Sequence, residues 1–315
     1  MLKNKVIHIE LNVITKERLD ILLSELFPAY SRSQIQSWIK AGSVLLNNEL
    51  ITKPKHKTNV KDHLILNVTL NERTADEPQE MPLDIIFEDK FILILNKPVG
   101  LVTHPGAGIE ENTLMNGLLF HCPENNLIPR AGIVHRLDKD TSGVMVIAKT
   151  IDAYNKLVDA FKDRTIEKLY QAIVYGQFKL SKTIAAPIGR HPQQRTKMAV
   201  IQKGKRAISH ITVLKRYTHF SHLRINIETG RTHQIRVHLA HDKHPIVGDK
   251  TYGRKPNYTN LDSKVSNWLE HQNTQLLHAS KISFHHPESN ELMTFEAPLE
   301  ENFEQGLETL NQYDL

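Results

Sequence analysis

The stretch Gly132-Ile-Val-His-Arg-Leu-Asp-Lys-Asp-Thr-Ser-Gly143 runs into the apolar segment Val144–Ala148, so a charged turn leads into a strand of the buried type. The turn brings four charged side chains together: Arg136, Asp138, Lys139 and Asp140. Cations this close can keep a carboxylate ionised, as a nucleophile or general base requires, and Asp138 is the candidate. The alternative is an ordinary charged turn capped by Asp140 or Thr141. If this turn is considered alone, the alternative is favoured.

The segments around this turn predict an α+β domain over residues 81–315. Apolar runs and alternation predict strands at 85–88, 91–95, 144–148, 168–174, 209–214 and 222–228, with a final strand after residue 279. Helical spacing predicts helices at 112–120 and 153–161, with a short helix after Gly230. This order lacks the regular strand–helix alternation of a doubly wound parallel sheet, and it favours a mixed, largely antiparallel sheet.

Residues 1–70 predict a separate small unit. Leucines at positions 19, 22, 23 and 26 predict one helix, and Ile35, Trp38 and Ile39 predict a second, with Ser31 as its N-cap and Gly42 at its end. Asn47-Asn48 predicts a tight hairpin turn, followed by a strand at 63–68. Residues 71–80 lack periodicity and are acidic, which predicts a linker.

Composition limits the class of protein. With 315 residues, 40% hydrophobic and 24% charged, the chain is a globular protein long enough for two domains. No apolar run approaches the roughly 18 residues of a membrane span, and residues 1–12 show no signal-peptide core. The single cysteine, Cys122, excludes an internal disulfide and a thiolate metal cage. We expect a cytoplasmic protein.

The positive charge of the chain is concentrated in two regions. Residues 1–70 hold ten Lys and Arg against six acids, a net +4, and residues 187–206 hold six bases and no acid. Two basic regions, one in each predicted domain, favour a long polyanion as partner, although two solvated charged faces explain the charge equally well. The candidate contacts are Arg18, Arg32, Lys40, Lys53 and Lys55 in the first region, and Arg190, Arg195, Lys197, Lys205 and Arg206 in the second.

Three further blocks place polar side chains among apolar ones. Tyr170 in the strand 167–172 could stack on a nucleobase or could be a core tyrosine. Residues 228–239 present five donors near one helix start, a pattern suited to phosphate or carboxylate recognition: Arg231, His233, Gln234, Arg236 and His238. The block 276–279 offers Leu277 for an apolar wall, with core packing as the alternative.

The sequence predicts no metal and no cofactor. Four histidines lie close in sequence, at positions 233, 238, 241 and 244, but no HExxH pair, cysteine partner or carboxylate set accompanies them. The glycines at 100, 106 and 108 match neither standard phosphate-binding spacing, and no serine or cysteine nucleophile motif is present.

Together, four blocks in this order resemble the RluA-type RNA pseudouridine synthases. Residues 135–143 resemble their motif I, 168–172 motif II, 230–238 motif III, and 276–279 the block that follows. Residues 31–33 and 42–48 resemble an S4 RNA-binding domain. The resemblance covers essentially the whole chain, and it implies an isomerase that turns uridine into pseudouridine without a cofactor.

The resemblance also implies roles for individual residues. Asp138 would be the catalytic carboxylate and Arg236 its salt-bridge partner, while Tyr170 would contact the base and Leu277 would close the apolar side. Arg136 would fill the place of the flipped uridine, helped by His135 and Arg231. The two basic regions would track phosphates, and Asp140 would be structural.

Four more stretches narrow the resemblance to synthases of the large ribosomal subunit: residues 27–33, 103–108, 129–140 and 247–249. They imply uridines in the helix 69 stem-loop of 23S rRNA as substrate, met within pre-50S particles, by an enzyme that is a monomer by default. Ser142, where this subtype can carry threonine, is a conservative departure. Another rRNA or tRNA uridine, or RNA binding without catalysis, are the alternatives.

Overall fold

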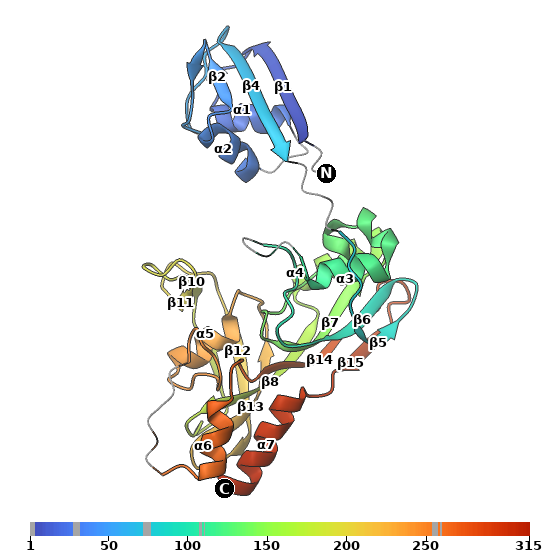
Figure 1. Cartoon of the computed structure of the whole chain (residues 1–315), viewed down its shortest axis with the longest axis vertical. Coiled ribbons are helices and arrows are strands. Elements are labelled where there is room, and N and C mark those ends of the chain that lie inside the picture. The colour runs from blue at the N-terminus through green and yellow to red at the C-terminus, as the bar shows by residue number, and fades with distance from the viewer. Residues whose placement is uncertain are drawn as a thin grey trace. The chain divides into compact units, whose positions relative to one another are not determined.

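The computed structural model describes residues 4–27, 32–71, 77–106, 109, 111–253, 258 and 260–315. The chain divides into two compact units, Met1–Ala75 and Asp76–Leu315, and each is described by itself (Figure 1). Part of the stretch predicted as a linker, 71–80, belongs to these units. Asn71 ends a strand of the first unit, whereas the backbone carbonyl of Glu77 accepts a hydrogen bond from Asn116 Nδ2 at 2.9 Å in the second.

Within its described residues, the first unit has four strands in the order β1-β4-β2-β3 and two helices. Its elements are β1 (Asn4–Asn12), α1 (Leu19–Leu26), α2 (Arg32–Lys40), β2 (Val44–Leu46), β3 (Glu49–Leu50) and β4 (His63–Asn71). The predicted helices, hairpin and strand are confirmed, but β1 was not predicted. It pairs antiparallel with β4 along its whole length, so the unit is more than two helices and a hairpin. Ser31, the predicted N-cap, lies outside the described residues.

Local backbone geometry explains why the predicted hairpin forms. Asn47 and Asn48 have φ values of 51° and 66°, which a tight two-residue turn requires and asparagine tolerates. Gly42, at φ 80°, ends α2 as expected. Apolar residues of α1, α2 and β4 form the core of the unit: Leu19, Leu23, Ile35, Ile39, Leu64 and Leu66 are all 0% exposed.

The second unit is built on a nine-stranded sheet with the order β5-β6-β7-β14-β8-β13-β12-β9, and β15 pairs with β14. Of its pairings only that of β7 with β14 is parallel, which confirms the predicted α+β class with a largely antiparallel sheet. The strands are β5 (Asp84–Glu88), β6 (Ile92–Lys97), β7 (Ser142–Ala148), β8 (Glu167–Tyr175), β9 (Lys182–Ala185), β12 (Ile208–Arg216), β13 (Phe220–Ile227), β14 (Leu277–His285) and β15 (Leu292–Glu296).

Helices and a small hairpin complete this unit. The helices are α3 (Leu114–His121), η1 (Pro123–Leu127), η2 (Pro129–Gly132), α4 (Ile151–Asp163), α5 (Gln234–His241), α6 (Ser263–Glu270) and α7 (Glu301–Tyr313). Within the basic segment 187–206, β10 (Ile188–Arg190) and β11 (Met198–Val200) form a separate two-stranded sheet that was not predicted. In the described parts of the chain, no helix has the length and apolar character that a membrane span needs.

The parallel pairing of β7 with β14 positions the charged turn. All seven residues of β7 are buried, and Ser142 and Gly143 pair with His278 and Ala279. Gly143 has φ 115°, and a Cβ there would lie 2.2 Å from the carbonyl oxygen of Ala279, so only glycine permits this approach. Because parallel strands begin at the same edge, the turn before β7 lies beside the first residue of β14, Leu277.

Candidate active site

Hydrogen bonds from three other segments hold the turn that carries Asp138. Thr103 Oγ1 donates to the Leu137 carbonyl at 2.9 Å. The Lys97 ammonium group donates to the Lys139 carbonyl at 3.1 Å, and Gln275 Nε2 donates to Thr141 Oγ1 at 2.7 Å. The polar groups of the turn are therefore fixed on both sides of Asp138, as a preorganised reacting group requires.

Asp138 opens into a small cavity of about 110 Å³. Four predicted residues from separate segments meet there: Asp138 before β7, Tyr170 on β8, Arg236 on α5 and Leu277 on β14. Arg136 and Arg231 also line it. The structure therefore brings together the four blocks that the sequence singled out.

Arg236 bridges two carboxylates. Its Nη1 donates to Asp138 Oδ2 at 2.8 Å, while Nε and Nη2 donate to the two oxygens of Asp249 at 2.7 and 2.9 Å. The paired arrangement with Asp249 fixes the plane of the guanidinium group. Nη1 is the Arg236 nitrogen that bonds Asp138, at Oδ2. Within the described residues Oδ1 of Asp138 makes no hydrogen bond, and His233 Nε2 lies 3.9 Å from it.

The charges of Asp138, Arg236 and Asp249, which lie in a row, stabilise one another. Burial alone would lower the pKa of Arg236, but the hydrogen bonds and charge of Asp249, with those of Asp138, raise it above its ordinary value. Burial would raise the pKa of Asp249, yet Arg236 and the backbone N–H groups of Tyr252 and Thr251 lower it. Both carboxylates share one permanently charged cation, so the row Asp138–Arg236–Asp249 has a net charge of −1 near neutral pH.

Tyr170 and Leu277 form the walls next to this row. Both side chains are buried, at 8% and 4% exposure, and both face the cavity. Burial first, and then the charge of Asp138, raise the pKa of the Tyr170 phenol, so it stays protonated at neutral pH. The phenol can therefore donate a hydrogen bond to a bound base but cannot act as a base itself.

His233 and Tyr252 form a second contact behind the site. The Tyr252 hydroxyl accepts a hydrogen bond from the Met198 N–H at 2.8 Å and lies 2.7 Å from His233 Nδ1. The Tyr252 ring also lies 5.0 Å from the Arg236 guanidinium carbon. Burial mainly lowers the pKa of His233, which favours the neutral ring, and its Nε2 lies on the side of Asp138. The basic β10–β11 hairpin is thereby joined to the catalytic row.

The structure gives different roles to the five donors predicted within residues 228–239. Gln234 uses its amide to hold the preceding turn, accepting from Thr229 Oγ1 at 2.7 Å and donating to the Ile208 carbonyl at 2.9 Å. His238 lies between Ser209 Oγ and the Ala186 carbonyl, each 2.9 Å away. These two side chains hold the fold, whereas Arg236 reaches the carboxylates.

The residues expected to aid base flipping lie on one rim. Arg136 is exposed and lines the cavity, as does Arg231, whose Nε donates to the Arg206 carbonyl at 3.2 Å. His135 is half-buried, stacks on Phe161 with 4.8 Å between ring centroids, and accepts the Val146 N–H at 3.1 Å through Nε2. Burial, with a contribution from the Lys168 charge, lowers the pKa of His135 to about 3, so it stands as a neutral wall residue.

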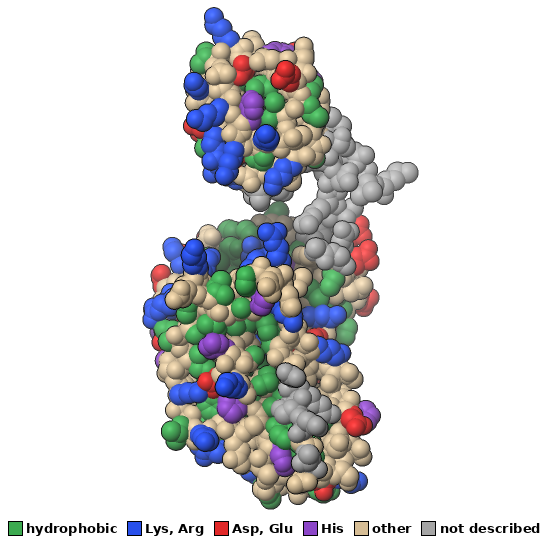
Figure 2. All heavy atoms as spheres, turned by 90° about the vertical axis from the view of Figure 1, so that its left-hand side faces the viewer, with side chains coloured by type: hydrophobic (Ala, Val, Ile, Leu, Met, Phe, Trp, Pro, Cys, Tyr) green, Lys and Arg blue, Asp and Glu red, His purple; other side chains and the backbone are tan. Residues whose placement is uncertain are grey.

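The predicted phosphate contacts are exposed or partly exposed, and three of them have carboxylate partners: Arg206 lies 3.5 Å from Glu228, and the other two share one acid. Arg18 and Arg32 both donate to Asp20, at 3.0 and 2.9 Å, and this carboxylate is fully buried. The other candidates are exposed or partly exposed: Lys40, Lys53 and Lys55 in the first unit, and Arg190, Arg195, Lys197, Lys205 and Arg206 in the second. Figure 2 shows one face of the chain, with Lys and Arg side chains on both units.

Four residues of the site were missed at the sequence level. Asp249 lay in a stretch used only for the resemblance, His233 was considered only as a donor or metal ligand, and Tyr252 was not considered. Lys97 is 0% exposed and donates to the carbonyls of Pro98, Leu101 and Lys139. A lysine at the end of an apolar strand, followed by proline, was the available signal.

The histidines at 233–244 do not gather into a metal site. His238 and His244 each bond a backbone carbonyl, of Ala186 and Tyr175 respectively. Among the residues that the structure describes, the three candidate ligands that come together are Glu88, His121 and Cys122. Lys149 already neutralises Glu88 there at 2.6 Å. The expected absence of a metal and a cofactor stays a prediction.

Comparison with known proteins identifies the family. The RNA pseudouridylate synthase model matches residues 91–241, and the S4 domain model matches residues 17–64. Ribosomal large subunit pseudouridine synthase D of Pasteurella multocida is 44% identical over 93% of this chain and 91% of that protein. The protein of the same name from Escherichia coli K12 is 43% identical over 93% of this chain and 90% of its own length.

The chain therefore belongs to the RNA pseudouridine synthase family and has an N-terminal S4 domain. It is an enzyme that isomerises uridine to pseudouridine in RNA, as the sequence led us to expect. The solved structures titled Human RNA Pseudouridylate Synthase Domain Containing 4 and Domain Containing 1 share its fold, with TM-scores of 0.56 and 0.55 and 24% identity each. They cover 72% and 76% of this chain, and 93% and 99% of their own lengths.

Proposed function

We propose that this enzyme modifies uridines in the helix 69 stem-loop of 23S rRNA, within pre-50S particles in the cytoplasm, and that it works as a monomer. The large-subunit target is supported by relatives named ribosomal large subunit pseudouridine synthase D, which are similar over more than nine-tenths of both chains. The observation that carries the chemistry is the pairing of Asp138 with Arg236 at 2.8 Å in a cavity walled by Tyr170 and Leu277.

The reaction breaks the bond from uracil N1 to C1′, turns the ring, and joins C5 to C1′. C5 loses its proton and N1 gains one, so no electron donor and no group donor are required. The free Oδ1 of Asp138 can either attack C1′ or remove the C2′ proton, and each route needs an ionised carboxylate. Arg236 pairs with Oδ2 of Asp138 and leaves Oδ1 free.

The surrounding side chains hold the base during its rotation. The target leaves its stack at a cost of a few kcal/mol, which is smaller in a loop than in a duplex. Arg136, exposed at the rim, fills the vacated place in the RNA, with Arg231 and the neutral His135 beside it. Tyr170 donates to the detached uracil and Leu277 closes the apolar side, so the base turns without diffusing away. The basic residues of both units supply phosphate contacts, hence affinity and register more than sequence reading.

Asp138→Asn tests the chemistry. RNA binding should remain within about twofold, and tritium release from RNA labelled at uridine C5 should fall to background. Asp140→Asn is the matched control, since it removes a carboxylate from the same turn and should leave turnover intact. Turnover that survives in Asp138→Asn would show that another group performs the chemistry.

The RNA target is tested separately. In a strain lacking this gene, carbodiimide mapping should show loss of pseudouridine in helix 69 of 23S rRNA, and the wild-type gene should restore it. Unchanged helix 69, with pseudouridine lost at another rRNA or tRNA position, would refute the target while leaving the chemistry in place.

A further inference from the structure

A second cavity adjoins the catalytic one in the same unit. It measures about 500 Å³ against about 110 Å³, and binding sites for whole ligands commonly span roughly 300–1,000 Å³. The two cavities share part of one wall, formed by Arg136, Tyr170, Ile227, Gly230 and Arg231. A nucleotide chain with one uridine in the small cavity can therefore continue into the large one.

The wall of the second cavity is strongly cationic. Six basic side chains line it: Arg130, Arg136, Lys162, Arg164, Lys168 and Arg231. Its one carboxylate, Glu228, is already engaged by His210 at 2.9 Å and Arg206 at 3.5 Å. Within the described part of the chain, none of the six cations forms an ion pair. Uncompensated like charges repel one another unless an anion binds among them.

Lys168 shows this lack of compensation most clearly. It is partly buried on β8, with its Nζ 5.5 Å from the centroid of the Phe161 ring. Burial, and then the charge of Arg164, lower the pKa of Lys168, and no carboxylate among the described residues pairs with it. Among the described residues, buried His104 Nδ1 in the same wall has no hydrogen-bond partner. Buried polar atoms ordinarily have a partner, which indicates that this wall receives a polar ligand.

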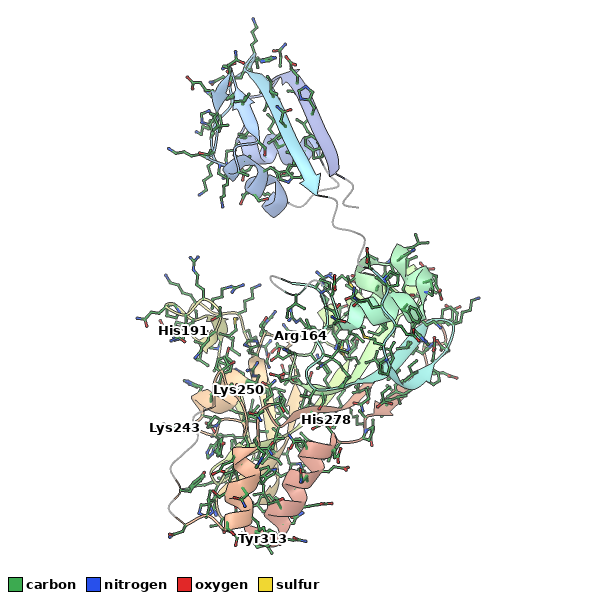
Figure 3. The ribbon with its side chains drawn as sticks, viewed as in Figure 1. Arg164, His191, Lys243, Lys250, His278 and Tyr313 are labelled. Atoms are coloured by element: carbon green, nitrogen blue, oxygen red, sulfur yellow. The ribbon has the colours of Figure 1, made fainter. Side chains whose placement is uncertain are left out.

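The backbone at the rim is held in an uncommon conformation. Arg130 and Ala131 have φ values of 55° and 51°, and Gly132 follows at 81°. A Cβ at Gly132 would lie 1.9 Å from the Ala148 carbonyl oxygen, so close packing on β7 fixes this turn. Non-glycine residues in the left-handed region concentrate at binding sites. Arg164, labelled in Figure 3, ends α4 with φ 62° and adds a second such residue to the wall.

We propose that the second cavity binds a backbone phosphate next to the target uridine on the same RNA strand, with Lys168, Arg164 and Arg130 as its ligands. This rests on the proposed function only in taking RNA as the substrate. Six cations without ion pairs favour an anion, and a phosphate of the substrate strand is chosen because the two cavities share a wall. Arg136, common to both, would separate the base from its neighbouring phosphate.

The experiment is a double-mutant cycle that combines a substitution in the protein with a neutral linkage in the RNA. Binding is measured with the full chain carrying Asp138→Asn, so that no turnover occurs, to an RNA hairpin that the wild type modifies. One neutral methylphosphonate linkage at a time replaces a phosphate around the target. Lys168→Gln should weaken binding roughly tenfold at 0.1 M salt and should make its salt dependence shallower by about 0.7–0.9 in slope.

In the protein that carries only Asp138→Asn, a methylphosphonate at one position next to the target should weaken binding by a similar factor. In the protein that also carries Lys168→Gln, the same methylphosphonate should weaken binding no further. Arg164→Gln, on another element, should show the same coupling. Lys179→Gln is the control, since Lys179 is exposed on the same unit and lines neither cavity. With Asp138 restored, kcat/KM of Lys168→Gln should fall by about the same factor as its RNA affinity.

The phosphate site would be overturned if Lys168→Gln and Arg164→Gln bound the RNA as tightly as the parent. It would also be overturned if every methylphosphonate weakened binding equally in the variants and in the parent. Failure of the target proposal gives a different result. A wrong rRNA position changes which RNA is used as the hairpin, whereas the coupling between Lys168 and one linkage is measured on whichever RNA the enzyme modifies.

Discussion

Asp249→Asn removes one negative charge from the row Asp138–Arg236–Asp249 while preserving the size of the side chain. Asp249 is 1% exposed and accepts from both Nε and Nη2 of Arg236. Asparagine keeps one acceptor oxygen and loses the other, so one of these two hydrogen bonds is broken. A hydrogen bond to a charged group contributes about 1.5–3 kcal/mol, and Arg236 keeps Asp138 as a partner. We expect the free energy of unfolding to fall by about 2–3 kcal/mol.

The same change should slow the reaction. In the wild type, Asp249 holds two of the guanidinium nitrogens and only Nη1 reaches Asp138. Once Asp249 is neutral, the full charge of Arg236 acts on Asp138, and Nη2 is free to approach Oδ1. Binding of that oxygen competes with its reaction at C1′ or C2′. We expect kcat to fall about 10- to 100-fold, equivalent to roughly 1.4–2.8 kcal/mol of transition-state stabilisation, with KM within threefold.

Single-turnover tritium release and urea denaturation measure the two effects. Asp314→Asn is the matched control, because Asp314 is also buried and paired, with His219 Nδ1 at 2.6 Å, but it lines neither cavity. It should lose stability and keep kcat. The pKa of Asp249 is lowered in the folded chain, so its contribution is complete well above pH 3.8 and is lost as the pH falls below that value. An unchanged kcat in Asp249→Asn would refute the role assigned to the row.

Three further changes test other parts of the structure. Tyr170→Phe removes the hydroxyl but keeps the ring, and kcat should fall about tenfold with unchanged stability, as expected for one neutral hydrogen bond made in the transition state; an unchanged kcat contradicts the assigned donor role. Lys97→Met leaves three carbonyls without their donor and should lower the free energy of unfolding at pH 7 by about 3 kcal/mol, measured in urea. Burial lowers the pKa of Lys97 to about 8 from 10.5, against the charges of Asp140 and Asp138, so the unfolded chain binds more protons between these values. The wild type therefore gains stability there, and its advantage over Lys97→Met should widen from pH 8 to 10; a constant gap contradicts this. Asp20→Asn should lower hydrogen-exchange protection in β4 by about 1–2 kcal/mol and leave β8 unchanged, because both its arginine partners are partly exposed; equal loss in both strands would contradict a local effect.

Elements with strong local periodicity were predictable from the sequence. The leucine spacing of α1 and the apolar run of β7 depend only on which face or strand is buried, and both were located within a few residues. Strand β1 was missed although Ile7, Ile9 and Leu11 alternate with polar residues, because its pairing partner lies more than fifty residues away. The β10–β11 hairpin has strands of three residues, too short for any period to show.

The residues of the site could be nominated from sequence, but their geometry could not. Nothing local shows that Arg236 bonds two carboxylates, since Asp138 lies 98 positions before it and Asp249 lies 13 after it. Gln234 and His238 carry the same kinds of polar group as their neighbours and differ only in what the fold places beside them. Side-chain direction on a short helix decides the role, and the parallel pairing of β7 with β14 decides which segments meet.

The two adjoining cavities offer different partners to an RNA strand, and this difference gives the order in which the strand must enter. In the small cavity Asp138 is paired with Arg236, and the walls formed by Tyr170 and Leu277 suit a neutral base and sugar. The large cavity presents six cations without ion pairs in the described structure, which attract a phosphate and offer little to a base beyond the Phe161–His135 wall. A strand held by its phosphate in the large cavity therefore presents the adjacent nucleoside to Asp138. An uncharged RNA analogue should lose this preference and gain nothing from Lys168.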